Sequence, residues 1–456
     1  MAVAEDRPEV EPSGRFATVR RTVATVLPQA PPLPGRAPAY VGAFLVAVFL
    51  GLFTPSGRPH LDHLWAEDGA RFTVDALRDS FWSNLVTPYG GYLHTVPRLI
   101  AEPLSLLPLS ALAPGIAVVV AILRAGIAML VFAASGGHLR WLPVRVVHAA
   151  LVVVLPAGNS EALGNLANLH WFLLYGAFWA LLWRPASRAA NIVAAVVVLL
   201  AALSSALVLL LFPLALLRLA LPDWRDRYAA IGFGVGAVVQ AVAMLNASRV
   251  PYADDPVDPV QLLLASILRG PVVTFVGSEA TPHVYPRFGN LVLLAAVLLA
   301  LVPIVAGLLG GARPHRFLIL LAAGYSGLIL VLNLVVNWTP ALQVQHPLVV
   351  QISQRYSVAP DLFLCTAIAA GLDLLPTRRW ARNIVLATRV AVAAVLFVSF
   401  AAHLRLGPRL DGLPWNTSVA NARQQCATGA PDAMLVHEPA GWFFIVPCQL
   451  VDAKSG

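Results

Sequence analysis

The stretch LVLLAAVLLALVPIVAGLL, residues 291–309, is apolar over its whole length. Its length is close to the ~20 residues that a helix needs to cross a bilayer. A strand of a membrane β-barrel would alternate polar and apolar residues, which neither this run nor the similar run at residues 191–203 does. The sequence therefore predicts an all-α fold, a polytopic bundle of membrane-spanning helices.

The composition supports this fold class. The chain has 456 residues, of which 58% are hydrophobic and 12% are charged, against roughly 25% charged residues in a soluble domain. This balance excludes a soluble globular enzyme. The net charge of +8 comes almost entirely from arginines in short clusters between apolar runs, since Lys454 is the only lysine. Such clusters indicate membrane orientation and lipid surroundings, and we expect no nucleic-acid partner.

The arginine clusters predict the topology. Arg15, Arg20, Arg21 and Arg36 precede the first apolar run, so we expect a cytoplasmic N-terminus. We predict eleven spans, at residues 40–53, 115–134, 146–155, 171–183, 191–203, 206–220, 229–245, 289–309, 317–336, 358–374 and 384–402, with residues 246–288 as an external loop. This places the main arginine clusters inside and the C-terminus outside, as expected in a bacterial plasma (inner) membrane.

The organisation along the chain follows from these spans. We predict that residues 1–38 form a disordered cytoplasmic arm, residues 39–403 the transmembrane domain and residues 404–456 a small extracytoplasmic tail. The first extracytoplasmic loop, residues 54–114, contains a predicted amphipathic surface helix at 66–85 and a proline-broken, half-embedded stretch at 95–109. Cys426 and Cys448 both lie in the tail, on the oxidising side, where we expect them to form a disulfide.

The first loop carries two adjacent carboxylates, Glu67 and Asp68, in the sequence WAEDG. One of them is suited to accept a proton from a substrate hydroxyl at the membrane interface. Neighbours on a helix diverge by ~100°, so only one of the two is expected to face a substrate. The alternative is that both merely cap the helix and favour its dipole. If one is catalytic, we favour Asp68, with Glu67 as the other candidate.

This acidic pair, which follows a short first span and opens a juxtamembrane helix, resembles the GT-C superfamily of polytopic glycosyltransferases. The resemblance implies an enzyme that transfers a sugar from a polyprenyl-phosphate donor to a glycan, lipid or protein of the cell envelope, on the extracytoplasmic side. No second acidic motif is as clear, with Glu161 and Glu279 the nearest candidates. We therefore predict no protein metal site, and a divalent cation as cofactor stays open.

A lipid-phosphate leaving group needs a cation, and arginine binds phosphate with two parallel hydrogen bonds. The candidates are Arg355 with the neighbouring Tyr356, Arg98 on the half-embedded stretch, and Arg124 in the second span. Their alternative roles are interfacial anchors for the first two arginines and a structural pairing for Arg124.

An acceptor or sugar surface is predicted at Asn165, Asn168, His170 and Trp171, with His94 from the first loop. The alternative is a polar loop leading into an aromatic belt. Two other functions stay open. A transporter or flippase of lipid-linked precursors would need charges deep in several spans. An O-antigen polymerase or ligase would use the loop at 337–355, with His346 and Arg355.

Overall fold

The computed structural model describes residues 15–32, 35–53, 60–157, 159–248, 256–344, 353–374, 379–405 and 412–454. In the described residues the regular elements are helices apart from one two-stranded sheet, which confirms the predicted helical fold. Six helical segments are long and apolar enough to cross a membrane: Leu109–Ser135, Arg225–Asn246, Pro259–Val276, Asn290–Gly310, Arg313–Val336 and Arg382–Ala402. Shorter apolar helices occupy Ala37–Phe53, Leu142–Val154, Leu169–Leu182, Arg188–Ala202 and Ala206–Leu219.

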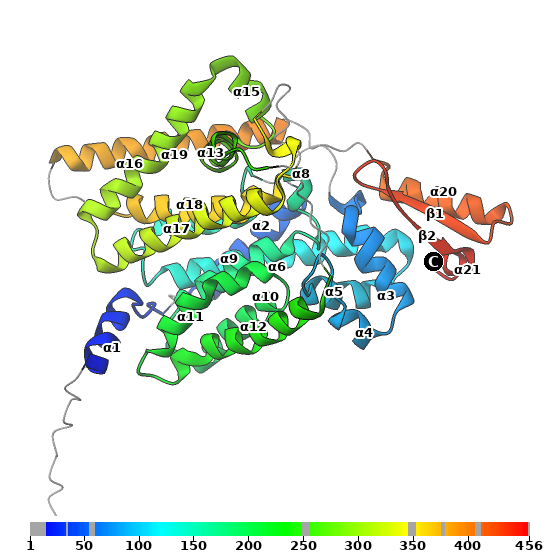
Figure 1. Ribbon diagram of the computed structural model, residues 1–456, viewed down its shortest axis with the longest axis horizontal. Helices are drawn as coiled ribbons and strands as arrows, with labels where there is room; N and C mark the ends of the chain where they lie inside the picture. The colour runs from blue at the N-terminus through cyan, green and yellow to red at the C-terminus, as the bar shows by residue number, and fades with distance from the viewer. Residues whose placement is uncertain are drawn as a thin grey trace, which may run out of the picture.

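The apolar helices form one bundle (Figure 1). Its members are α2 (Ala37–Phe53), α6 (Leu112–Ser135), α7 (Leu142–Val154), α9 (Leu169–Leu182), α10 (Arg188–Ala202), α11 (Phe212–Leu219), α12 (Tyr228–Asn246), α16 (Asn290–Gly310), α17 (Arg313–Val336), α18 (Arg355–Leu372) and α19 (Arg379–Arg405). Short 3₁₀ turns precede several of them: η3 (Leu109–Ala111), η4 (Ala206–Leu211) and η5 (Arg225–Arg227). Every residue of α9 is buried, so this helix lies at the centre of the bundle.

One segment predicted as an external loop is helical. Within residues 246–288 the chain builds α13 (Pro259–Ile267), the π-helix η6 (Leu268–Val272), α14 (Val273–Val276) and α15 (Thr281–Phe288). Asp258 caps α13, because its carboxylate accepts the backbone N–H of Val260 at 2.8 Å. The loop prediction is wrong here because a π-turn accommodates Pro271, so that the helical path continues past the proline.

The predicted disorder of the N-terminal arm is also wrong for part of its length. Residues 15–26 form α1 (Arg15–Val26), and the side chains of Val23 and Leu27 are buried. The guanidinium of Arg184 donates to the carbonyl oxygen of Leu27 at 2.8 Å, and the N–H of Ala30 donates to the carbonyl of Arg184 at 3.0 Å. A distant arginine therefore fixes this segment to the bundle.

The first loop and the tail together form a cap on one end of the bundle. The cap comprises η1 (His60–Asp62), the π-helix η2 (Asp68–Thr73), α3 (Val74–Arg78), α4 (Phe81–Val86), α5 (Thr95–Ser105), α20 (Trp415–Ala427), β1 (Asp432–His437), β2 (Trp442–Pro447) and α21 (Cys448–Ala453). Figure 1 shows the red tail elements beside the blue helices of the first loop. One core unites them, in which Phe72 and Leu109 pack with Trp415 and Leu435.

The single amphipathic helix predicted at 66–85 is instead three helical segments. The helix ends at Arg78, Asp79 is extended, and α4 begins at Phe81. The break turns α4 so that Phe81, Trp82 and Val86 are exposed, Trp82 to 75%. Exposed aromatic and branched side chains on a short helix suit a membrane interface.

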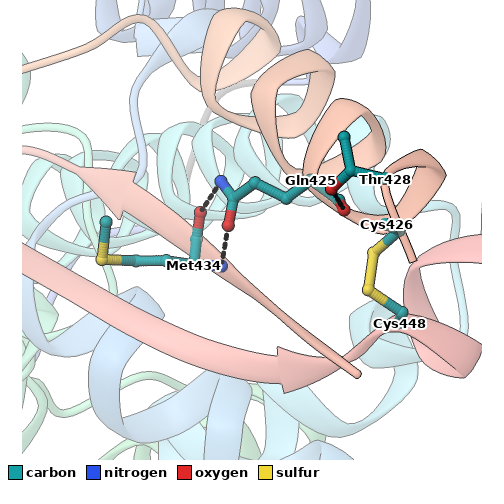
Figure 2. The surroundings of a disulfide bond; sticks show 5 residues. All are labelled: Gln425, Cys426, Thr428, Met434 and Cys448. Atoms are coloured by element: carbon teal, nitrogen blue, oxygen red, sulfur yellow. Dashed lines mark hydrogen bonds between the residues drawn. A yellow bond between two sulfur atoms is a disulfide. The ribbon is translucent and has the colours of Figure 1, made fainter. Parts of the chain in front are cut away.

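The tail is held by the predicted disulfide, which is confirmed. Cys426 at the end of α20 bonds Cys448 at the start of α21, and their Cα atoms are 5.4 Å apart. Figure 2 shows that Gln425 also joins α20 to β1, since its side chain both accepts from the N–H of Met434 and donates to its carbonyl. β1 and β2 pair antiparallel, with Asp432 opposite Pro447.

Removal of this disulfide is expected to loosen the tail. Replacing Cys426 with serine opens a loop with a sequence separation of 22 residues, a cross-link worth ~3 kcal/mol in the chain-entropy model. We expect limited proteolysis to cut the Cys426→Ser tail faster than the wild-type tail, while the bundle stays intact. A Cys365→Ser variant, which loses only a buried free thiol, is the control. Equal cleavage rates for Cys426→Ser and wild type would contradict the expectation.

Close helix packing in the bundle depends on glycine. A Cβ on Gly371 of α18 would overlap the carbonyl oxygen of Pro303 on α16. Small residues at such crossings let membrane helices approach each other. We expect Gly371→Ala to lower the free energy of unfolding by ~1–3 kcal/mol, seen as a lower melting temperature in detergent. Gly324→Ala on α17, whose Cβ would meet nothing within 4 Å, is the control and should not lower it.

Candidate functional site

A large cavity lies between the cap and the bundle, with a volume of about 810 Å³. This volume is within the ~300–1,000 Å³ of typical small-molecule sites. The lining includes side chains from distant parts of the chain: Trp65, Glu67, Tyr89, Tyr92 and His94 from the first loop, Glu161, Asn168, His170 and Trp171, then Asn333, Asn337, Arg355 and Tyr356, and Pro439 and Trp442 from the tail. The cavity thus collects most of the residues predicted from the sequence.

The two adjacent carboxylates point in different directions. Asp68 is fully buried and does not line the cavity. Its two carboxylate oxygens accept the backbone N–H groups of Leu166 and Ala167, at 2.8 Å and 2.9 Å. Burial raises the pKa of Asp68 to about 8, against the effect of these two donors. A general base must first reach its proton, so this geometry outweighs the pKa and gives Asp68 a structural role.

Glu67 is partly exposed and lines the cavity. The residue before it, Ala66, has φ 27°, a left-handed conformation that a residue other than glycine rarely adopts. The chain then enters the π-helix η2, a type of helix often found at functional sites. This unusual backbone separates the two carboxylates, so that Asp68 enters the protein and Glu67 faces the cavity. Of the two carboxylates, Glu67 is therefore the one that a ligand in the cavity can reach, rather than the Asp68 that the sequence analysis favours.

The cavity lining also contains an arginine of the kind expected to bind an anion. Arg355 begins α18, its side chain is 35% exposed, and it forms an ion pair with Glu161. The guanidinium lies 5.1 Å from the ring centre of Tyr356. Glu161 also interacts electrostatically with the buried Arg269, so it is shared between two arginines. Glu67 is near enough to Arg355 to interact with its charge.

The other two candidate arginines lie outside the cavity wall. Arg98 is fully buried, and its ion pair with Asp75 at 2.9 Å joins α5 to α3. Arg124 is also fully buried and donates to the backbone carbonyls of Leu163 at 2.6 Å and Val153 at 2.6 Å. These bonds cap the end of α7 and fix the chain that follows it. In this structure both arginines make structural contacts, and neither lines the cavity.

The amide residues predicted to bind sugar are mainly bonded to each other. The amide groups of Asn165 and Asn168 both donate to the carbonyl of Glu161, and Asn168 accepts the indole N–H of Trp171 at 3.1 Å. Asn165 lies behind the cavity wall, whereas Asn168 and Trp171 line it. The group acts chiefly as a frame that holds Glu161.

The two predicted histidines both line the cavity and lie near each other. His94 stacks on Tyr92 at 4.3 Å and lies 6.0 Å from His170. Burial lowers the pKa of His94 to about 3, so it is neutral at pH 7. Its Nδ1–H donates to the carbonyl of Tyr92 at 3.3 Å, which leaves Nε2 as an acceptor.

One side of the cavity is apolar. Leu207 and Leu210 of η4, Met244 of α12, and Leu332 and Val336 of α17 form this side. The neighbouring outer surface of α12 is strongly exposed and apolar, with Leu245 86% exposed. A ligand with an acyl or isoprenoid chain could leave the cavity on this side without exposing the chain to water.

Sequence reasoning missed three aromatic contributors: Trp65, the turn around Tyr89 and Tyr92, and Trp442. Gly90 and Gly91 have φ 61° and 89°, which makes a tight turn and pairs Tyr89 with Tyr92. The sequence YGGY already contains the glycines that such a turn requires. Trp442, by contrast, reaches the cavity only because the tail packs on the first loop.

Among the described residues, no group of three or more His, Cys, Asp or Glu side chains could hold a metal ion. Glu279 accepts a hydrogen bond from Gln354 at 2.9 Å, one residue before Arg355. His346, the histidine of the polymerase or ligase alternative, lies outside the described residues.

Comparison of the chain with protein-family models, with curated proteins and with solved structures finds no match.

Proposed function

We propose that the protein is a GT-C-like membrane glycosyltransferase that transfers a sugar from a polyprenyl-phosphate donor to an acceptor hydroxyl of the cell envelope. The supporting observation is one cavity with Glu67 on one wall, Arg355 on another and an apolar side next to exposed helix surface. A lipid-linked phosphate has this combination of charge and apolar chain. Glu67, which belongs to the cap, also provides a base for an acceptor in the cavity.

In the proposed reaction, Glu67 takes the proton of the acceptor hydroxyl while the oxygen attacks the anomeric carbon of the donor sugar. A new C–O bond forms on one face, and the bond between the anomeric carbon and the phosphate oxygen breaks on the other. The anomeric configuration is therefore inverted. Polyprenyl phosphate leaves with both bonding electrons, and Arg355 stabilises its growing negative charge. The proton ends on Glu67, from which water removes it.

Arg355 can exchange partners in this reaction. In the free protein its guanidinium pairs with Glu161 and approaches the hydroxyl of Tyr356 at 3.5 Å. A donor phosphate would bind the exposed part of the guanidinium. Because Glu161 retains its interaction with Arg269, it is not left uncompensated when Arg355 turns toward phosphate.

We also propose the eleven-span topology, with the N-terminus in the cytoplasm, the cap outside and the chain in a bacterial plasma membrane. Each of the eleven predicted spans overlaps a bundle helix, and five of them fall on segments long and apolar enough to cross a membrane. The additional apolar segment Pro259–Val276 fits as a re-entrant element. Its Arg269 donates to the carbonyl of Ala341 at 3.0 Å and interacts with Glu161, so the middle of this segment lies at the level of the cavity.

The test is transfer by the purified protein in nanodiscs. A panel of radiolabelled polyprenyl-phosphate sugars is supplied with delipidated cell-envelope glycans as acceptors. We expect label to move from at least one donor to the glycan, with equimolar release of polyprenyl phosphate. Label that stays on the lipid for every donor would contradict the proposal. In sealed proteoliposomes, labelled donor that moves intact to the opposite leaflet without transfer would favour a flippase.

A further inference from the structure

The cap contributes two indole side chains, Trp65 and Trp442, to the lining of the cavity that also contains Glu67. Trp65 precedes Glu67 by two residues, and Trp442 begins β2 in the tail. Backbone bonds bring them together, since the N–H of Ala66 donates to the carbonyl of Glu438 at 2.5 Å and the N–H of Glu438 donates to Leu64 at 3.0 Å. Trp442 pairs with His437 across the hairpin, next to this junction.

These two indoles differ from the other aromatic groups of the wall. Arg71 lies over the ring of Tyr89 at 5.4 Å, and Tyr92 is stacked on His94. In the described part of the chain, no ring stacks on Trp65, and the ring nearest to Trp442 is that of His437, tilted and 6.4 Å away. Both indoles are only partly buried. Both also line the cavity, so each can contact a ligand there.

From this arrangement we infer that Trp65 and Trp442 bind the acceptor, and that the acceptor is a carbohydrate chain. The inference rests on the proposed transfer reaction. A pyranose ring carries C–H groups on its faces and hydroxyls around its rim. The electron-rich face of an indole attracts such C–H groups, while Glu67, which lines the same cavity, accepts a rim hydroxyl.

The surroundings favour a carbohydrate over a peptide or a second lipid. An extended peptide would bind by adding a strand to the edge of the hairpin. Next to the cavity, the backbone at Glu438 already forms a β-bridge with Trp65, so this part of the edge is occupied. A lipid acceptor would need an apolar wall on the cap side. The apolar side chains Leu207, Leu210 and Met244 belong to the bundle instead.

The chain offers a matched pair of variants for the test. Phe443 is next to Trp442 on β2, is 50% exposed and does not line the cavity. We compare Trp442→Ala and Trp442→Phe with Phe443→Ala, after a check that all three have the wild-type melting temperature and disulfide. We expect Trp442→Ala to raise the acceptor KM about tenfold or more, with the donor KM unchanged. Trp442→Phe should restore most of the loss, and Phe443→Ala should match wild type.

A second measurement needs no turnover. Neutral tetrasaccharides of glucose, mannose, galactose and arabinose are added to protein in a detergent without a sugar headgroup, and binding is followed by saturation-transfer NMR. We expect at least one to bind wild type and Phe443→Ala, but not Trp442→Ala. Binding without transfer would support this site and refute the proposed function. Transfer by wild type with an unchanged acceptor KM in Trp442→Ala, or transfer to a peptide, would overturn the carbohydrate site.

Discussion

Glu67→Gln is expected to lower the turnover number of sugar transfer by about 10²–10⁴-fold, which is the range for loss of a general base. The substitution keeps the size of the side chain and removes its ability to take a proton. Glu67 is partly exposed, so we expect the melting temperature to stay at the wild-type value. Initial rates at saturating donor and acceptor measure the effect. A Glu67→Gln enzyme with wild-type turnover would remove Glu67 from the mechanism.

Asp68→Asn is the matched control for this prediction. The new amide group would put N–H donors against the N–H of Leu166 or Ala167, both of which Asp68 now accepts. We expect a loss of ~1–3 kcal/mol in the free energy of unfolding, with turnover per folded molecule much less affected than in Glu67→Gln. The opposite pattern, a stable Asp68→Asn protein without activity, would identify Asp68 as the base.

Arg355→Ala is expected to have the second largest effect, a fall of roughly 10²–10³-fold in kcat/KM for the donor, as for loss of one group that stabilises a leaving or oxyanion charge. Arg355→Lys keeps the charge but loses the planar pair of donors, so its rate should lie between those of Arg355→Ala and wild type. The measurement is the initial rate as a function of donor concentration.

Arg98→Lys separates phosphate binding from structure. Arg98 pairs with Asp75 behind the cavity wall, so this variant should lower the melting temperature and leave the donor KM unchanged. If Arg355→Ala kept the wild-type donor kcat/KM, or if Arg98→Lys raised the donor KM, the assignment of the phosphate to Arg355 would be wrong.

The helices were predictable because their signal is local. A run such as residues 291–309 is long and apolar enough to be a helix whatever lies beside it, and α16 covers it. The disulfide was predictable because Cys426 and Cys448 share a short tail. The helix at residues 15–26 was not predictable, because its position depends on contacts with the distant Arg184 and on the burial of Val23 and Leu27.

The candidate site likewise combines features that the local sequence predicts with features that depend on distant contacts. The acidic pair and Arg355 were identifiable from residue type and position, but the choice between the two carboxylates was not. Asp68 lies outside the cavity, where its carboxylate accepts the backbone N–H groups of Leu166 and Ala167, which are 98 and 99 residues away in the sequence. Trp442 was missed for a similar reason, since only the packing of the tail on the first loop brings it to the cavity.

The central claim is that one cavity holds a lipid-linked phosphate sugar between Glu67 and Arg355. The most direct test is an experimental structure of the protein in nanodiscs with a C-glycosyl polyprenyl phosphonate, in which a carbon bridge prevents transfer. We predict the phosphonate on Arg355, the anomeric carbon facing the Glu67 carboxylate, and the isoprenoid chain leaving past Met244 and Leu332. A ligand bound elsewhere, or one whose phosphonate lies away from Arg355 with Glu67 remote from the sugar, would contradict the account.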